Sequence, residues 1–165
     1  MKLKQLEFGQ KFKVNGTTWI LLDKIDSGYL CVMEKPIRDD KIDNITNNWQ
    51  FTSLRKSLNS NVKKIVNMSK DNLIPFERCL KTMDGSAYCK TIDTVSLLTY
   101  EEYIKYKVWI NKGTIGGFWL LTPHSILIDY LGVVVYFDGT IDFDEVSNDY
   151  SILPCICLNG EIEVC

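Results

Sequence analysis

Turn-forming pairs of asparagine or aspartate with glycine stand near both ends of this chain, each beside short apolar segments. The first pair, Asn15–Gly16, separates residues 11–14 from residues 17–22. A type I′ turn needs a positive φ at both central residues, which asparagine and glycine adopt readily, so this pair predicts a tight β-hairpin. A second turn at residues 26–28 precedes a strand-like run over residues 29–34. We therefore expect the chain to begin with an antiparallel meander.

The C-terminal third carries the same β signature. The pairs Asp138–Gly139 and Asn159–Gly160 predict two further hairpins. Residues 161–164 alternate between charged and apolar side chains, as a half-exposed strand does. Strand-like segments cover residues 117–122, 131–137 and 152–158, whereas residues 35–48 are polar and predict a connecting loop.

The middle of the chain changes period. Apolar side chains recur at three- and four-residue steps between residues 49 and 68, which predicts a helical face made of Leu54, Leu58, Val62, Ile65 and Val66. Thr52 or Ser53 is suited to cap its first amides. Polar residues 59–61 weaken the centre, so the segment predicts one long helix or two short ones. Residues 74–92 show no clear period and predict irregular structure.

Thr99 and Glu102 form a capping box, in which the threonine hydroxyl and the glutamate carboxylate each accept from the other residue's backbone amide. Leu98 and Tyr103 flank the box at the spacing of a hydrophobic staple. The sequence predicts a helix from Tyr100 to about residue 110, ended by residues 111–113. Strands at both ends with two main helices between them predict a single α+β domain over residues 1–165, with mixed and antiparallel sheets.

Composition excludes several classes of protein. The chain is 45% hydrophobic and 24% charged over 165 residues, as globular domains are, and not as disordered chains or coiled coils are. The net charge of −2 lacks the basic surplus of a duplex-binding protein, so we expect no direct nucleic-acid partner. The first residues lack a signal-peptide pattern, and the longest apolar run, residues 131–137, is too short to span a membrane. We expect a cytoplasmic protein without a membrane partner, with its six cysteines reduced.

The sequence predicts neither a catalytic nor a metal site. His124 is the only histidine, and no partner motif accompanies it, so we interpret it as a loop residue and not as a general base. Cys155 and Cys157 point to one face of a strand, where core packing is expected more than zinc chelation. Residues 113–117 follow a helix and precede a strand, the reverse of a phosphate-binding loop. The acidic stretch after residue 138 fits no EF-hand spacing, and no cofactor is expected.

A binding surface is the more informative hypothesis. Four aromatic residues flank polar turns in the C-terminal β region, and three carboxylates lie among them. Aromatic side chains beside acids on a stiff sheet are typical of interfaces. The residues expected to bind are Tyr130, Tyr136, Asp142, Phe143, Asp144, Glu145 and Tyr150. The four tryptophans lie in apolar segments and are expected in the core.

Four segments, in order, resemble an uncharacterised domain family of bacteria and of their phages and prophages. Residues 48–59 contain NW followed by SLRKSLN, residues 93–103 read DTVSLLTYEEY, residues 118–123 read FWLLTP and residues 135–139 read VYFDG. Residues 151–154 read SILP where that family has a GVRP motif, so Leu153 stands at the position of its arginine. That ending is in turn similar to C-type-lectin-like and formylglycine-generating-enzyme folds. The resemblance implies a C-type-lectin-like α+β fold.

Two functions are expected from these observations. The first is a non-enzymatic recognition module, encoded by a phage or prophage, which binds a protein of the virion or host, or a glycan. The alternative is a small intracellular inhibitor of a host defence system, comparable to an anti-CRISPR protein, which acts by protein–protein binding. A thiol-dependent enzyme is a third class, and the leucine at position 153 argues against it.

Overall fold

The computed structural model describes residues 1–110 and 116–165, and these residues confirm the α+β prediction. One five-stranded sheet has the order β1-β2-β3-β12-β7, with β1 (Lys11–Val14), β2 (Thr17–Lys24), β3 (Tyr29–Met33), β12 (Cys155–Leu158) and β7 (Val95–Ser96). The second has the order β10-β9-β8-β11-β4, with β10 (Ile141–Glu145), β9 (Leu131–Val135), β8 (Phe118–Pro123), β11 (Tyr150–Ile152) and β4 (Arg38–Asp40). Strands β5 (Phe76–Arg78) and β6 (Thr91–Asp93) form a separate pair. The pairing of β11 with β8 is parallel, so the second sheet is mixed.

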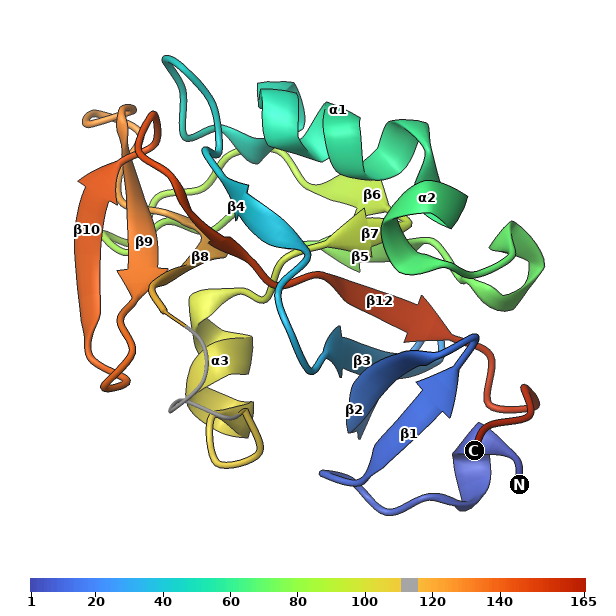
Figure 1. Ribbon diagram of the computed structural model, residues 1–165. Coiled ribbons are helices and arrows are strands. Elements are labelled where there is room, and N and C mark those ends of the chain that lie inside the picture. The colour runs from blue at the N-terminus through green and yellow to red at the C-terminus, as the bar shows by residue number, and fades with distance from the viewer. Residues whose placement is uncertain (111–115) are drawn as a thin grey trace.

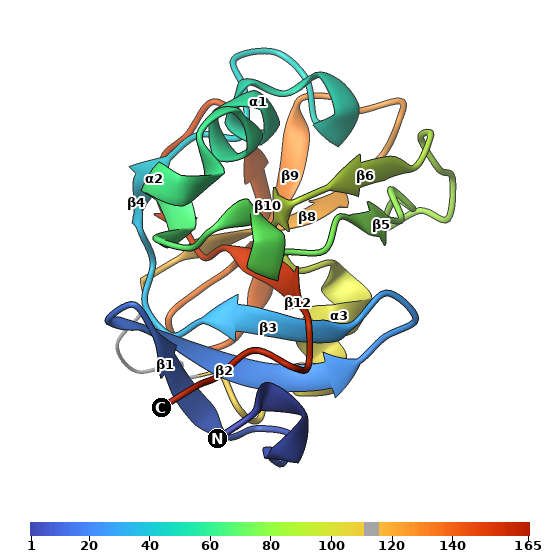
Figure 2. The ribbon, with the colours of Figure 1, turned by 90° about the vertical axis from the view of Figure 1, so that its right-hand side faces the viewer.

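The helices lie on different sides of the sheets. They are α1 (Ser53–Ser60), α2 (Val62–Val66) and α3 (Tyr100–Tyr106), with 3₁₀ turns η1 (Leu3–Gln5), η2 (Trp49–Phe51) and η3 (Lys70–Asn72). Figures 1 and 2 place α1 and α2 at the opposite end of the molecule from the β1–β3 meander. Both termini lie beside β1, where the amide of Val164 donates to the carbonyl of Met1 (2.8 Å).

The central strands of both large sheets are buried on both faces. Side chains alternate along β2 between two core clusters, so that Trp19 and Leu21 belong to one cluster and Ile20 and Leu22 to the other. Strand β8 alternates in the same way, and all six of its residues are buried. Each cluster therefore combines side chains from both sheets, and neither sheet has a core of its own. Trp19, Trp49 and Trp119 are buried as expected, while Trp109 is partly buried and stacks on Tyr106.

Local signals in the sequence are confirmed where they specify backbone geometry. Asn15 and Gly16 both have positive φ, at 49° and 83°, and join β1 to β2 as a hairpin. The capping box of α3 is formed, with Thr99 Oγ1 accepting from the amide of Glu102 (3.2 Å). The segment after residue 49 divides into η2, α1 and α2, because Asn61 lies outside helical geometry and caps α2.

Four predictions about elements were wrong. The expected loop over residues 35–48 contains β4, and the expected irregular region over residues 74–92 contains β5 and the start of β6. The helix begun by the capping box ends at Tyr106, four residues early, because the amide of Trp109 turns back to the carbonyl of Tyr106 (3.0 Å). The chain after Asn159–Gly160 forms a turn and one isolated bridge to Lys2 instead of a strand. The expected helix stop at 111–113, and all but the last two residues of the 113–117 loop, lie outside the described residues.

Candidate functional site

The residues predicted to bind a partner divide between two faces of β10. Asp142 and Asp144 pair with Val134 and Gly132 of β9, whereas Phe143 pairs with Val133. Because successive side chains of a strand point to opposite faces, Phe143 and Glu145 lie on one face and the two aspartates on the other. The sequence correctly predicted a strand here, and the residues expected to bind do not share one face of it.

On the aspartate face, three of the predicted residues bind one another. The hydroxyl of Tyr150 donates to the Asp144 carboxylate, and the Tyr150 ring packs edge-on against Trp119 at 5.0 Å. Tyr136 packs on Tyr150 at 6.3 Å. The hydrogen bond to Asp144 and burial raise the pKa of Tyr150, so its hydroxyl keeps its proton. These side chains therefore have a structural role at the rim of the core, and their role in binding a partner stays a prediction.

The backbone of β10 is shielded at its open edge. Within the described residues β10 pairs only with β9, and the carbonyl of Thr140 and the amide of Val146 point toward that strand. The intervening amides of Phe143 and Glu145 therefore face away from it. Each donates to the carboxylate of the aspartate before it, at 2.8 Å. Carboxylates over the free amides discourage the addition of another strand, so this edge favours docking through side chains.

Two loops lie on the Phe143 side of the molecule, namely residues 41–48 before η2 and residues 124–130 after β8. One asparagine joins them. The buried side chain of Asn47 donates through Nδ2 to the carbonyls of Ser125 (2.9 Å), Ile128 (3.2 Å) and Leu131 (2.9 Å). Its Oδ1 accepts from the hydroxyl of Tyr88 (2.8 Å). The three Nδ2 bonds tie the loop before η2 to the chain between β8 and the start of β9, and the Tyr88 bond ties the same loop to the hairpin of β5 and β6, so the loops are held in one conformation.

The start of the first loop is held by a second polar side chain. The Asp43 carboxylate accepts from the backbone amides of Ser53 (2.8 Å), Ile45 (3.0 Å) and Thr46 (3.2 Å). Burial opposes ionisation of Asp43, but these amides outweigh that effect and lower its pKa. The loop is consequently rigid as well as exposed.

These rigid loops expose large apolar side chains that the sequence analysis missed. Leu127 is 92% exposed, Ile45 is 76% exposed and Tyr130, which was predicted, is 51% exposed. Apolar side chains held in water on ordered backbone are typical of binding sites. The loop–edge surface, as we call it, consists of Ile45, Leu127, Tyr130, Phe143 and Glu145, together with the Asp142 carboxylate, which lies over the Phe143 amide at the adjoining edge of β10. Ile45 stands among polar residues in the predicted loop over residues 35–48, which is a signal for its exposure, whereas Leu127 has isoleucine on both sides and nothing in the sequence separates it from a core residue.

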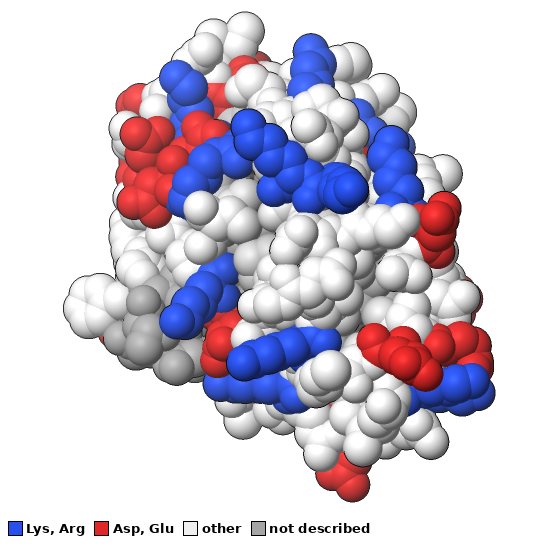
Figure 3. All heavy atoms as spheres, turned by 45° about the vertical axis from the view of Figure 1, so that its right-hand side comes forward, with Lys and Arg blue, Asp and Glu red and all other residues white. Residues whose placement is uncertain are grey.

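Charge is divided between two parts of the protein. The chain from residue 44 to residue 70 contains basic residues and no carboxylate, and α1 and α2 expose Lys56, Lys63 and Lys64. Figure 3 shows lysine and arginine side chains gathered over the part of the molecule where these helices lie. No lysine or arginine follows Lys112, although carboxylates continue to the end of the chain. The small net charge therefore averages over a basic stretch and a C-terminal part that has carboxylates but no lysine or arginine.

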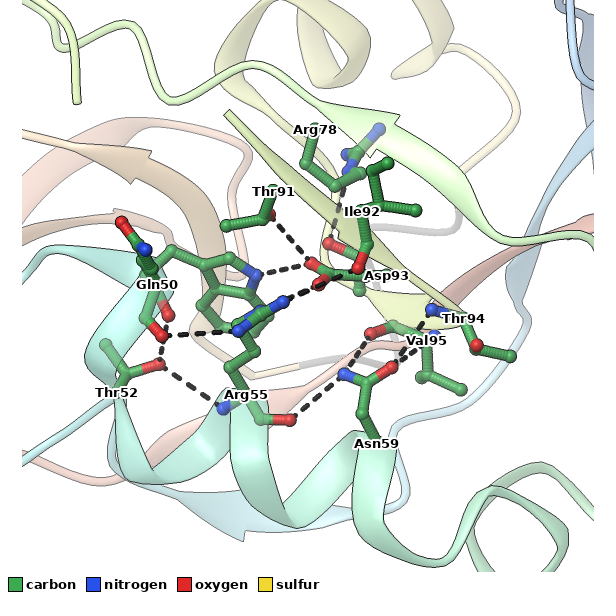
Figure 4. Close-up of polar contacts among 12 residues, drawn as sticks. Gln50, Thr52, Arg55, Asn59, Arg78, Thr91, Ile92, Asp93, Thr94 and Val95 are labelled. Atoms are coloured by element: carbon green, nitrogen blue, oxygen red, sulfur yellow. Dashed lines mark hydrogen bonds and ion pairs between the residues drawn. The ribbon is translucent and has the colours of Figure 1, made fainter. Parts of the chain in front are cut away.

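Behind these surfaces lies a buried polar network, drawn in Figure 4. The Asp93 carboxylate accepts from the indole Nε1 of Trp49 (2.7 Å), from Nε of Arg55 (2.7 Å) and from the hydroxyl of Thr91 (3.2 Å). One helical turn further, Asn59 Oδ1 accepts from the amides of residues 94 and 95 at 3.0 Å. These contacts fix η2 and α1 against the end of β6.

A second buried ion pair fixes α3. The Arg78 guanidinium binds both carboxylate oxygens of Glu102, and it also donates to the hydroxyl of Ser96 (3.1 Å) and the carbonyl of Leu97 (2.7 Å). Burial opposes ionisation of Glu102, but Arg78 and the amide of Thr99 outweigh it and lower the pKa of the carboxyl group. Because Glu102 also accepts from the amide of Thr99, the ion pair is joined to the cap at the start of α3.

No protein-family model, no curated protein and no solved structure matches the chain. The resemblance to an uncharacterised bacterial and phage family, and the C-type-lectin-like fold, therefore stay predictions. The two longest resembling segments contribute residues to the buried networks, namely Trp49, Arg55, Asn59, Asp93, Ser96, Thr99 and Glu102. The resembling segments thus describe the scaffold and leave the exposed loops unspecified.

The remaining sequence candidates occupy other settings. His124 lies in the loop after β8 with its ring edge-on to Phe143 at 4.2 Å, and its buried Nδ1 has no hydrogen-bond partner among the described residues. Cys155 and Cys157 are buried in the core with free thiols. In the part of the chain that the structure describes, no group of three or more histidine, cysteine, aspartate or glutamate side chains is placed to hold a metal ion. Across residues 1–110 and 116–165, none of the helices has the length and apolar character of a membrane span.

Proposed function

We propose that this protein is a non-enzymatic recognition module that binds a protein partner through the loop–edge surface. The observation that carries the proposal is the exposure of Leu127 and Ile45 on loops that Asn47 and Asp43 hold rigid. Burying such side chains contributes about 25 cal/mol per Å² of apolar area removed from water. Because the loops are already ordered, little of that gain is lost to ordering them on binding.

The charges around these apolar side chains favour a basic partner surface. Asp142 and Glu145 are exposed, and no lysine or arginine follows Lys112 in the chain that carries them. Complementary charge accelerates encounter and disfavours acidic partners. A phage or prophage origin, and a partner in the virion or the bacterial host cell, are part of this proposal on the resemblance alone.

The test compares two substitutions at matched exposed apolar positions. Leu127→Asp places a charge in the loop–edge surface, and Val108→Asp does the same at a residue that is 78% exposed after α3. The tagged proteins are used to capture partners from bacterial lysate, with and without phage infection, and the captured protein is purified for titration. We expect Leu127→Asp to weaken binding at least tenfold and Val108→Asp to leave it unchanged. Equal affinity of the two variants for the captured protein would reject the proposal, as would turnover of a substrate that is lost in His124→Ala.

A second candidate function follows from the same acidic side chains. A protein that inhibits a nuclease by occupying its nucleic-acid channel needs exposed carboxylates near apolar contacts. For this function, the double variant Asp142→Lys with Glu145→Lys should weaken binding more at low salt than at high salt. Asp144 is left unchanged, because its carboxylate is bound by Tyr150. Affinity that is independent of salt, and of both substitutions, would exclude the inhibitor.

A further inference from the structure

The hairpin that β5 and β6 begin continues past the two strands with a change of register. In the ladder Arg78 lies opposite Thr91, and further along Lys81 forms a bridge with Ala87. Residues 79 and 80 separate the two pairs on the first strand, whereas residues 88, 89 and 90 separate them on the second, so the second strand has one residue more. The amide of Tyr88 donates to the carbonyl of Leu80 (3.1 Å), which places Tyr88 opposite Leu80. Cys79 therefore lies opposite the bulged residues 89 and 90.

The side chains of this bulge share the outer face of the hairpin, which Figure 2 shows projecting from the rest of the molecule. Cys79, Cys89 and Lys90 are exposed, while the alternate residues Arg78 and Leu80 are buried. Lys90 donates to the carboxylate of Glu77 at 2.7 Å, which keeps it on the Cys79 side. The pKa of Lys90 is raised mainly by that bond and to a smaller extent by the nearby Cys79 sulfur. Two exposed thiols thus lie across the hairpin from one another.

We propose that Cys79 and Cys89 form a reversible disulfide when the protein meets a low-molecular-weight disulfide such as oxidised glutathione. Opposed residues of antiparallel strands have Cβ atoms about 4.5–5.5 Å apart, and a disulfide needs about 3.5–4.5 Å. Closing the bond requires a shift of about 1 Å, at a place where the ladder is already interrupted.

The reaction needs no other reagent. The thiolate of one cysteine attacks a sulfur of oxidised glutathione, which forms a mixed disulfide and releases one glutathione thiolate. The thiolate of the second cysteine then attacks the protein sulfur of that mixed disulfide and releases the second glutathione. The two protein thiols lose two protons and two electrons, and the glutathione disulfide gains the electrons and becomes two thiols.

The other cysteines do not compete. Cys31, Cys155 and Cys157 are buried, and burial raises their pKa values, that of Cys157 to about 11. Few thiolates therefore form at these positions near neutral pH. Cys165 is exposed and open to glutathione, but its backbone is paired with Lys13 beside β1, away from the hairpin of β5 and β6 (Figure 2), so it does not compete for the bond between Cys79 and Cys89.

The disulfide would act next to a contact of the loop–edge surface. Tyr88 precedes Cys89, and its hydroxyl binds Asn47, the residue that joins the two exposed loops. Oxidation would thus fix the strand that carries this contact. The thiol chemistry itself does not depend on the proposed function and is tested without a partner.

The experiment treats the native protein with oxidised glutathione, blocks remaining thiols with iodoacetamide under unfolding conditions, and digests it with trypsin. Cleavage after Arg78, Lys81 and Lys90 releases residues 79–81 and residues 82–90 as separate peptides. We expect mass spectrometry to find them joined, with a mass two hydrogens below their sum, and separated again by a reductant.

Three variants make the result specific. Cys79→Ser and Cys89→Ser should each keep a glutathione adduct on the remaining cysteine, because the second attack has no thiol. Cys165→Ser should still give the joined peptides. Glutathione adducts on both Cys79 and Cys89 of the unsubstituted protein, without joined peptides, would overturn the proposal, and so would a bond from either residue to Cys165 instead.

Discussion

Asp93→Ala should be among the most destabilising single substitutions in this protein. The Asp93 side chain is 0% exposed and is an acceptor for Trp49, Arg55 and Thr91 at once. Its removal leaves two charge-bearing or polar donors, the Arg55 guanidinium and the Trp49 indole N–H, without their acceptor. Neither is able to reach water freely, because Trp49 is buried and the Arg55 side chain is 26% exposed.

The magnitude follows from these two losses. Removing one partner of a buried ion pair costs about 3–5 kcal/mol, and the partial exposure of Arg55 favours the lower end, about 3 kcal/mol. An indole N–H left without a partner adds about 1 kcal/mol. The expected loss of unfolding free energy is about 4 kcal/mol, which for a chain of this size lowers the melting temperature by about 8–16 °C.

The assay is urea unfolding followed by far-ultraviolet circular dichroism, because a tryptophan signal would report the altered surroundings of Trp49 itself. The free energy comes from the midpoint and the slope of the transition. The control is Glu77→Ala, which removes the exposed ion pair with Lys90 and should leave the midpoint unchanged. A loss below about 1 kcal/mol in Asp93→Ala would refute the view that this network holds η2 and α1 in place.

Two further predictions concern other parts of the interior. Because Arg78 lowers the pKa of Glu102 below its ordinary 4.5, the carboxylate stabilises the fold above that pH, and stability should fall as acid protonates it. Glu102→Gln should flatten this acid dependence in pH-resolved thermal melts, and an unchanged profile would contradict the assignment. Gly9→Ala should lower the melting temperature more than Gly85→Ala, since both have φ near +90° but only at Gly9 would a Cβ lie 2.5 Å from Trp109. Equal melting temperatures in differential scanning calorimetry would mean that the Trp109 contact is unimportant.

The sequence predicted those elements whose signal lies within a few residues. The Asn15–Gly16 turn and the Thr99 capping box each specify backbone conformation locally, and both are formed. Strand β4 carries no such signal, because its residues 38–40 are polar and charged. It is a strand because β11, more than a hundred residues later, lies beside it and offers a ladder. Pairing between distant segments is the physical reason for this error and for the missed β5–β6 hairpin.

Only part of the candidate site could be predicted, because exposure also depends on contacts between distant segments. Residue type and nearness to polar turns grouped Phe143 with Tyr150, but the structure exposes Phe143 and holds the hydroxyl of Tyr150 on Asp144. Burial of a side chain depends on what packs over it. The exposure of Leu127 follows from the way Asn47 holds its loop against the loop before η2, and that contact joins residues about 80 positions apart.

The separation between scaffold and surface determines what a resemblance is able to predict for this protein. Asp93 binds both Trp49 and Arg55, and these three residues join η2, α1 and β6. A chain that shares them is therefore expected to share this arrangement. None of the three contributes to the loop–edge surface. Two proteins with the same network are therefore free to differ at Ile45 and Leu127, and with them in partner. Function in such a scaffold is best sought by substituting the exposed loops, while substitutions in the network report stability.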